Sequence, residues 1–225
     1  MSSAPERDES ERTTDPAARP ADPAARPADP AAGAAGRSER AAEQLLVARS
    51  LLDELGLVAR WSRYGDVTVV GSVGIGVVVA PDIDLEVRGE VRVADGFAVM
   101  AALAELPKVR RITYLDARDR HERGQYWKLE YELTDAVTWT VDTWVFDPGA
   151  PGGGALTAAV RDALGVEERD VVLMIKEEAA AVGERAPGYW LYQAVLDGGV
   201  RSYAEFRGWL GDRNIYERTG WLPTI

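Results

Sequence analysis

Five segments between residues 66 and 146 have the residue patterns of β-strands, so this part of the chain must form a sheet. Residues 66–71 are mostly β-branched, and residues 82–88 alternate between polar and apolar side chains, as in a strand with one buried face. Three further strands are predicted near 109–115, 125–133 and 137–146. The spacing of these segments leaves room for helices before, between and after them.

The helices are predicted from apolar stripes and from capping residues. Ser38 can cap a helix that runs to about Leu55, where Gly56 ends it. Another helix is predicted at 95–106, and four more follow the Gly/Pro-rich segment 147–154, at 155–164, 167–182, 188–197 and 201–210. We therefore predict an α+β fold: a mixed-sheet core with flanking helices over 37–147, and a helical C-terminal part over 148–225.

Residues 1–36 have a composition unlike the rest of the chain. They contain half of the 12 prolines and a seven-residue repeat that starts at Asp15 and again at Asp22. Two prolines in each repeat prevent a continuous helix, and the Pro/Ala/charge composition buries too little apolar surface to offset the entropy of ordering. We predict a disordered leader or tether.

Composition excludes several classes of function. The 225 residues include no Cys and a single His, His121, in a very polar run, so thiolate zinc sites, cysteine nucleophiles and multi-histidine metal sites are excluded. A net charge of −11 argues against broad binding to nucleic acid. No apolar stretch approaches the roughly 20 residues of a membrane span, and there is no signal-peptide pattern, so we expect a cytoplasmic protein without a membrane partner.

Asp82 and Asp84 form the most informative acidic pair. Alternate residues of a strand point the same way, so Asp82, Asp84 and perhaps Glu86 share one face, opposite the apolar residues between them. At about 4 Å and an effective dielectric near 20, each like-charge pair costs roughly 4 kcal/mol. Either the strand end is open to water, or a hard divalent cation such as Mg²⁺ lies between the carboxylates.

Gly71 and Ser72 end the strand before this pair and are candidates for phosphate binding. Glycine permits close approach to the backbone, and the hydroxyl can donate to phosphate oxygens. Two known phosphate loops fail here. A Walker A loop needs Lys-Ser/Thr after Gly76, where two valines stand, and the dinucleotide fingerprint needs a third glycine where Val79 stands.

Asp142 is the candidate for a third carboxylate. It is the only charged residue inside the predicted strand 137–146, and a charge among tryptophans needs an open face, a partner or a metal. Glu130 and Glu132 are weaker rivals on the preceding strand. The alternative is a structural ion pair between Asp142 and one of three basic residues: Arg110, Arg111 or Lys128.

These motifs resemble the signature of the DNA polymerase β-type nucleotidyltransferase superfamily. A hydrophobic residue precedes Gly71-Ser72, a spacer follows, then Asp82-Ile-Asp84-Leu, and Asp142 stands where the third acid of that superfamily is usual. Residues 174–176, 189–200 and 205–210 also resemble uncharacterised bacterial proteins of this class. The resemblance covers most of residues 66–210.

The resemblance implies a nucleotidyltransferase fold and metal-dependent transfer of a nucleoside monophosphate from a nucleoside triphosphate (NTP). Asp82 and Asp84 would hold two Mg²⁺ ions, and Asp142 would bind the catalytic ion and help to deprotonate an acceptor hydroxyl. The residues do not indicate which nucleotide base is bound, and we take ATP as the expected nucleotide.

Two residues of the helical part are further binding candidates. Lys176 is a candidate phosphate ligand, although a solvated helix face explains it equally well. Tyr189, with Trp190 and Tyr192, could stack on a nucleotide base, but aromatic residues at helical spacing are more often core.

Three functions remain open at this stage. The first is an enzyme that modifies a small-molecule hydroxyl, and the second is the same chemistry on a protein or an RNA end, which the acidic balance disfavours. The third is a catalytically silent binding module of the same fold. The uncharged spacer at 73–81 supports the third, because many members of the superfamily carry Arg or Lys there.

Overall fold

The computed structural model describes residues 30–120, 123–150, 152–215, 217 and 219–224. Residues 1–29 of the predicted leader and His121 lie outside this range. Among the described residues, no helix is both long and apolar enough to cross a bilayer.

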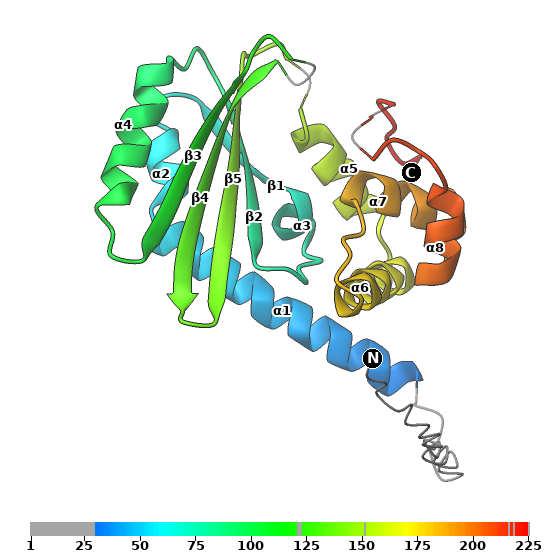
Figure 1. Cartoon of the computed structure of the whole chain (residues 1–225). Helices are drawn as coiled ribbons and strands as arrows, with labels where there is room; N and C mark the ends of the chain where they lie inside the picture. Colours follow the sequence, from blue (N-terminus) through cyan, green and yellow to red (C-terminus); the bar gives the residue numbers. More distant parts are fainter. Residues whose placement is uncertain (1–29, 121–122, 151, 216, 218, 225) are drawn as a thin grey trace, which may run out of the picture.

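The five predicted strands form one mixed sheet (Figure 1). Its strands are β1 (Asp66–Val70), β2 (Asp82–Arg88), β3 (Val109–Ala117), β4 (Gly124–Thr134) and β5 (Val137–Phe146). Their order in the sheet is β1-β2-β5-β4-β3. Strands β2 and β5 are parallel, and the other neighbours are antiparallel. The α+β prediction with a mixed sheet is confirmed.

One face of the sheet is buried under helices. Helices α1 (Pro30–Glu54), α2 (Leu57–Trp61) and α4 (Val93–Ala104) contribute to a core with the apolar residues of the strands. These include Ile83, Leu85 and Val141, which are fully or almost fully buried. Because neighbouring strand residues point to opposite faces, Asp82, Asp84 and Asp142 must lie on the other face.

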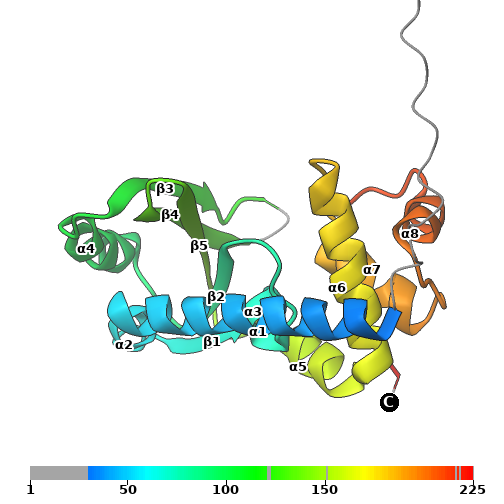
Figure 2. The ribbon, with the colours of Figure 1, turned by 90° about the horizontal axis from the view of Figure 1, so that it is seen from below.

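The C-terminal part packs around a second core. Its helices are α5 (Gly154–Ala163), α6 (Val166–Ala181), α7 (Gly188–Leu196) and α8 (Tyr203–Leu210). Helix α1 contributes to both cores, with Ala41 in the second and Ala48 in the first. Figure 2 shows α1 running beneath both the sheet and α6.

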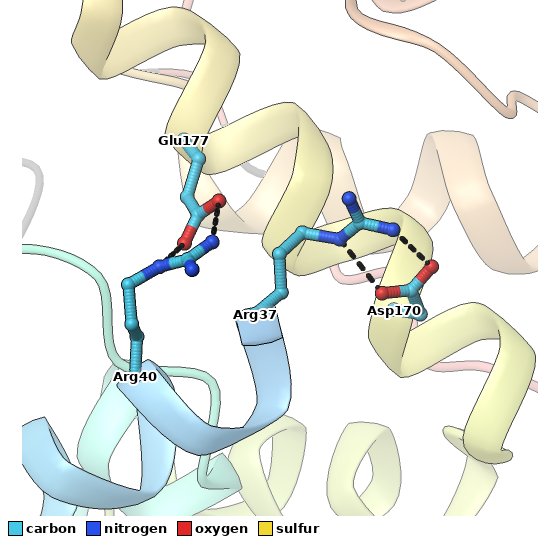
Figure 3. A network of polar contacts seen from close by, with 4 residues as sticks. All are labelled: Arg37, Arg40, Asp170 and Glu177. Atoms are coloured by element: carbon cyan, nitrogen blue, oxygen red, sulfur yellow. Dashed lines mark hydrogen bonds and ion pairs between the residues drawn. The ribbon is translucent and has the colours of Figure 1, made fainter. Parts of the chain in front are cut away.

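Two bidentate ion pairs join α1 to α6. Arg37 donates to both carboxylate oxygens of Asp170 at 2.8 Å, and Arg40 donates to those of Glu177 at 2.9 and 2.7 Å (Figure 3). Bidentate Arg–carboxylate pairs fix orientation as well as distance. They therefore fix the position of α6 relative to α1, which also packs against the sheet.

The structure corrects two sequence-based predictions of local structure. The first helix begins at Pro30 rather than at Ser38, so residues 30–36 belong to α1 and not to a disordered leader. Proline is favoured in the first turn of a helix, and the contacts of Arg37 and Arg40 stabilise the early turns. Gly71 and Ser72 do not lie in a strand end or turn: they begin the short helix α3 (Gly71–Ile75).

Candidate functional site

Three aspartates from two neighbouring strands converge on the face of the sheet opposite α1, α2 and α4. Asp84 on β2 lies opposite Asp142 on β5 in the parallel register, and Asp82 lies two residues before Asp84 on the same face. One carboxylate oxygen from each lies within 4.8 Å of the other two. We call Asp82, Asp84 and Asp142 the aspartate triad.

The triad is electrostatically unfavourable without a cation. Burial, and then the charges of Asp82 and Asp142, raise the pKa of Asp84 from 3.8 to about 7. Burial, and then the charge of Asp82, also raise the pKa of Asp142. An acid whose pKa is higher in the folded state than in the unfolded state lowers stability as the pH rises through that interval. Near pH 8 the ionised Asp84 therefore destabilises the metal-free fold.

Hydrogen bonds and ion pairs orient the two outer carboxylates. Asp82 accepts a hydrogen bond from the Thr140 hydroxyl at 2.6 Å and lies 3.0 Å from the Arg185 guanidinium. Asp142 Oδ1 accepts a hydrogen bond from the Tyr126 hydroxyl at 2.9 Å and lies 3.5 Å from Lys128 Nζ. Of the basic residues considered as structural partners of Asp142, Lys128 is therefore the one that contacts it.

Gly71 touches the triad through its backbone. Its φ of 64° is left-handed, and a Cβ built there would lie 2.0 Å from Asp84 Oδ2. The Gly71 N–H donates to the Thr157 hydroxyl on α5 at 3.2 Å. Ser72 follows in α3, and its hydroxyl has no hydrogen-bond partner within the described part of the chain, so it is free to bind a ligand.

Lys176 on α6 extends toward the triad. Its ammonium donates to the Val77 carbonyl at 2.8 Å and is close enough to Asp84 and Asp82 for their charges to affect its titration. Burial lowers the pKa of Lys176 to about 8, so the side chain is largely cationic at neutral pH. Asp170 and Glu177, whose ion pairs join α6 to α1 (Figure 3), precede and follow Lys176 in the sequence of α6.

Tyr189 contacts the C-terminal segment. Its hydroxyl accepts hydrogen bonds from the backbone N–H groups of Thr219 at 3.0 Å and Trp221 at 2.9 Å. Its ring packs edge-on against Trp190 and Trp221. Within the described part of the chain Tyr189 has no hydrogen bond to the triad, and its stacking on a base stays a prediction.

Tyr192 on the same helix lies closer to the acids. It is buried, and burial together with the charge of Asp84 raises the pKa of its hydroxyl above the usual range.

Three other acids on this face have structural partners. Glu130 pairs with Arg111 at 3.3 Å and Glu132 with Arg110 at 2.7 Å, and neither belongs to the group of carboxylates that could hold a metal ion. Glu86 is buried and accepts hydrogen bonds from the N–H groups of Gly153 and Gly154, at 2.6 and 3.3 Å. Glu86 therefore holds the start of α5 against the sheet.

Sequence reasoning missed four residues that contact the site: Tyr126, Thr140, Thr157 and Arg185. Thr140 was recoverable, because it shares the strand face of Asp142. Tyr126 follows from the β4–β5 register, in which Lys128 lies opposite Asp142. Thr157 and Arg185 come from the helical part, and no local pattern indicates their position.

Three carboxylate ligands suit a hard divalent cation, and burial raises the pKa of two of them, Asp84 and Asp142. Magnesium prefers carboxylate oxygens together with phosphate oxygens of a substrate. A softer metal would favour nitrogen or sulfur ligands, which the triad does not offer. The donor set therefore fits Mg²⁺.

Comparison with known proteins gives a structural likeness only. No protein-family model and no curated protein matches the sequence. A cytoplasmic RNA terminal U-transferase matches 74% of this chain and 54% of its own, with a TM-score of 0.52 and 18% identity. Cid1, an RNA terminal uridylyl transferase, matches 74% of this chain and 52% of its own, also at 0.52 and 18%. The Cid1 poly(U) polymerase with bound MgGTP matches 72% of this chain and 53% of its own, at 0.50 and 20%.

At these identities the likeness concerns the fold alone. The chain spans about half the length of the solved structures that it matches.

Proposed function

We propose that this chain, whose fold is that of the DNA polymerase β-type nucleotidyltransferases, transfers a nucleoside monophosphate from an NTP to a hydroxyl acceptor. The observation that carries the proposal is the aspartate triad, with its oxygens within 4.8 Å of one another. The fold likeness supports the class of reaction, and the triad supplies the chemistry.

The triad residues are proposed to hold two Mg²⁺ ions, with ATP as the working nucleotide. When bound, Mg²⁺ supplies charge neutralisation to the triphosphate and polarises its α-phosphorus. Asp82 and Asp84 approach from one strand and Asp142 from the next, so a cation between them relieves the repulsion that raises the pKa of Asp84.

Asp142 is proposed to accept the proton of the acceptor hydroxyl. Tyr126 and Lys128 both contact Oδ1, and within the described part of the chain Oδ2 has no hydrogen-bond partner. This arrangement fixes the position of Oδ1 and leaves Oδ2 for the acceptor or the cation. A positioned carboxylate of this kind commonly contributes about 10²–10⁴-fold to a proton-transfer step.

Two cations and one hydroxyl are available for the triphosphate. Lys176 and Arg185 lie beside Asp84 and Asp82 respectively, and Ser72 follows Gly71 at the start of α3. Arg185 lies in the segment between α6 and α7, and its side chain is 80% exposed. It supplies to the site a positive charge that the spacer at 73–81 lacks.

The acceptor is proposed to be a small molecule, and the net charge of −11 supports this over a long nucleic acid. The proteins of similar fold are RNA terminal uridylyl transferases, so an RNA end is the second candidate for the acceptor. A catalytically silent module is the third. The cytoplasm remains the predicted location.

Thermal stability with metal and nucleotide tests the proposal. At pH 8 without metal, Asp84→Asn should be more stable than the wild type, because it removes a destabilising buried charge. With Mg²⁺ and an NTP at about 100 times its Kd, the wild type should gain about 2.7 kcal/mol, and the variant should gain little. Adding Mg²⁺ and the NTP should therefore raise the melting temperature of the wild type relative to that of the variant.

Glu130→Gln is the matched control, because it neutralises an acid on the same sheet face outside the triad. It should keep the metal-dependent gain. A wild type that shows no Mg²⁺-dependent gain with any NTP would favour the silent module and contradict the enzymatic proposal.

A further inference from the structure

Three aromatic side chains continue along the sheet from the triad. Trp144 and Phe146 follow Asp142 at alternate positions of β5 and share its face, and Tyr126 on β4 lies opposite Trp144. The rings of Tyr126 and Trp144 are 4.9 Å apart, and those of Trp144 and Phe146 are 5.7 Å apart with planes 2° from parallel. We call Tyr126, Trp144 and Phe146 the aromatic row.

The aromatic row belongs to neither hydrophobic core. Its three residues are absent from both clusters of packed apolar side chains, and Tyr126 and Trp144 are only half-buried. Phe146 is 9% exposed and lies over Gly124, where an added Cβ would come within 2.7 Å of its ring. Phe146 is thus packed against the start of β4, whereas Tyr126 and Trp144 are only partly buried.

The row also contacts the proposed proton acceptor directly. The Tyr126 hydroxyl donates to Asp142 Oδ1 at 2.9 Å, so the first ring of the row is fixed relative to that carboxylate. Cross-strand aromatic pairs also stabilise sheets by themselves. Tyr126 and Trp144 differ from an ordinary stabilising pair in two ways: Tyr126 donates a hydrogen bond to Asp142, and both residues are only partly buried.

The far end of the row borders a cavity of about 460 Å³. Phe146 and Gly124 line it together with Arg118 and Arg123. Arg118 pairs with Asp116, whereas the Arg123 side chain has no hydrogen bond or ion pair within the described part of the chain. From Asp142 to Phe146 the strand advances about 13 Å, which is farther than one nucleoside extends.

We propose that the aromatic row is the acceptor subsite, and that it receives the base of a nucleoside whose ribose hydroxyl reaches Asp142. This inference rests on the proposed function. The hydroxyl oxygen would bond to the α-phosphorus as its proton passes to Asp142, and the bond from that phosphorus to the pyrophosphate oxygen would break. Stacking on the rings of these partly buried aromatic residues favours binding of a flat base over a saturated sugar.

The base belongs either to a free nucleoside or to the 3′-terminal nucleotide of a strand. A free nucleoside would occupy the aromatic row and extend no farther. A strand continues toward Arg123, whose guanidinium has no ion-pair partner among the described residues and suits a phosphate. Arg123→Ala therefore distinguishes them, because it weakens binding of a strand and leaves binding of adenosine unchanged.

The test measures binding of adenosine and of a labelled six-nucleotide oligoribonucleotide to the full chain. Trp144→Thr should weaken binding of the better ligand about tenfold or more. Trp144→Phe keeps a ring and should stay within about threefold of the wild type. The wild type should bind an oligonucleotide without its 3′-terminal base as weakly as Trp144→Thr binds the intact oligonucleotide. Combining the variant with the shortened oligonucleotide should cause no further loss of affinity.

Stabilisation by Mg²⁺ and an NTP, measured on the same variants, separates the two proposals. It should be unchanged by Trp144→Thr, because the row lies outside the triad. Base-dependent binding without that stabilisation would support the subsite and count against the proposed enzyme. Wild-type protein that binds neither ligand, or Trp144→Thr that binds both normally, would overturn the acceptor subsite. The proposed enzyme would then be judged by the stabilisation with Mg²⁺ and an NTP alone.

Discussion

Asn in place of Asp142 should lower kcat for nucleotidyl transfer by about 10³-fold or more, with little change in the fold. The substitution removes both a cation ligand and the proposed proton acceptor, and general-base catalysis alone accounts for about 10²–10⁴-fold. Asn retains an oxygen that can accept the hydrogen bond from Tyr126, so the local packing should persist. The measurement is pyrophosphate release with the nucleotide and acceptor that support the wild-type rate.

Glu130→Gln provides the comparison for this loss. Glu130 lies on the neighbouring strand and pairs with Arg111, outside the triad. Its neutralisation should change kcat by less than about threefold, as expected of a half-exposed ion pair. Equal losses in the two variants would mean that general charge on this face, rather than Asp142 itself, supports the reaction.

Gly71→Ala should reduce transfer about 100-fold or more, because a displacement of about 1 Å at a reacting group can cost this much. An alanine Cβ would lie 2.0 Å from Asp84 Oδ2 and 2.9 Å from its Cγ, so the carboxylate must move. The backbone φ of 64° adds strain of about 1–2 kcal/mol. The activity loss should therefore exceed what the lost stability explains.

Gly76→Ala is the control that isolates the displacement of Asp84. Gly76 is also left-handed, with a φ of 85°, but the nearest atom to its added Cβ is Arg169 Nη1 at 3.4 Å. Urea unfolding and transfer rates should be measured for both variants. Similar losses of stability with activity lost only in Gly71→Ala support the account, whereas equal losses of activity would attribute the effect to backbone strain.

Much of the fold could be predicted because its elements carry strong local patterns. The alternation in residues 82–88 places Asp82 and Asp84 on one face and Ile83 and Leu85 on the other, and the structure has this arrangement. Local patterns could not predict that β2 and β5 are neighbours, because paired residues of these strands are 58 positions apart in the chain. Asp142 was indicated by its place as the only charged residue inside a predicted strand, and the family resemblance supported it.

The errors arose where distant contacts override local preference. Residues 67–70 form a strand, as their β-branched side chains predict, but Gly71 begins a helix that packs against β2 and α5 instead of continuing the strand. The left-handed φ of Gly71 allows the chain to turn abruptly after β1. Helix α1 likewise begins early, and its ion pairs to α6 come from residues more than 130 positions away.

The contacts of Arg185 also depend on tertiary structure. Its segment between α6 and α7 has no regular pattern, and its guanidinium reaches Asp82 across 103 positions of sequence. The sequence therefore indicated the acids of the site together with Lys128 and Lys176, but not Arg185.

Anomalous diffraction from crystals grown with Mn²⁺ and a non-hydrolysable NTP analogue tests directly whether the three carboxylates share a cation. We expect a metal peak bounded by oxygens of Asp82, Asp84 and Asp142 at about 2.0–2.2 Å, as for Mg²⁺-type oxygen ligation, with the analogue's phosphates completing the shell. Metal peaks only at other acids, with the side chain of Asp142 unligated beside Tyr126, would contradict the account.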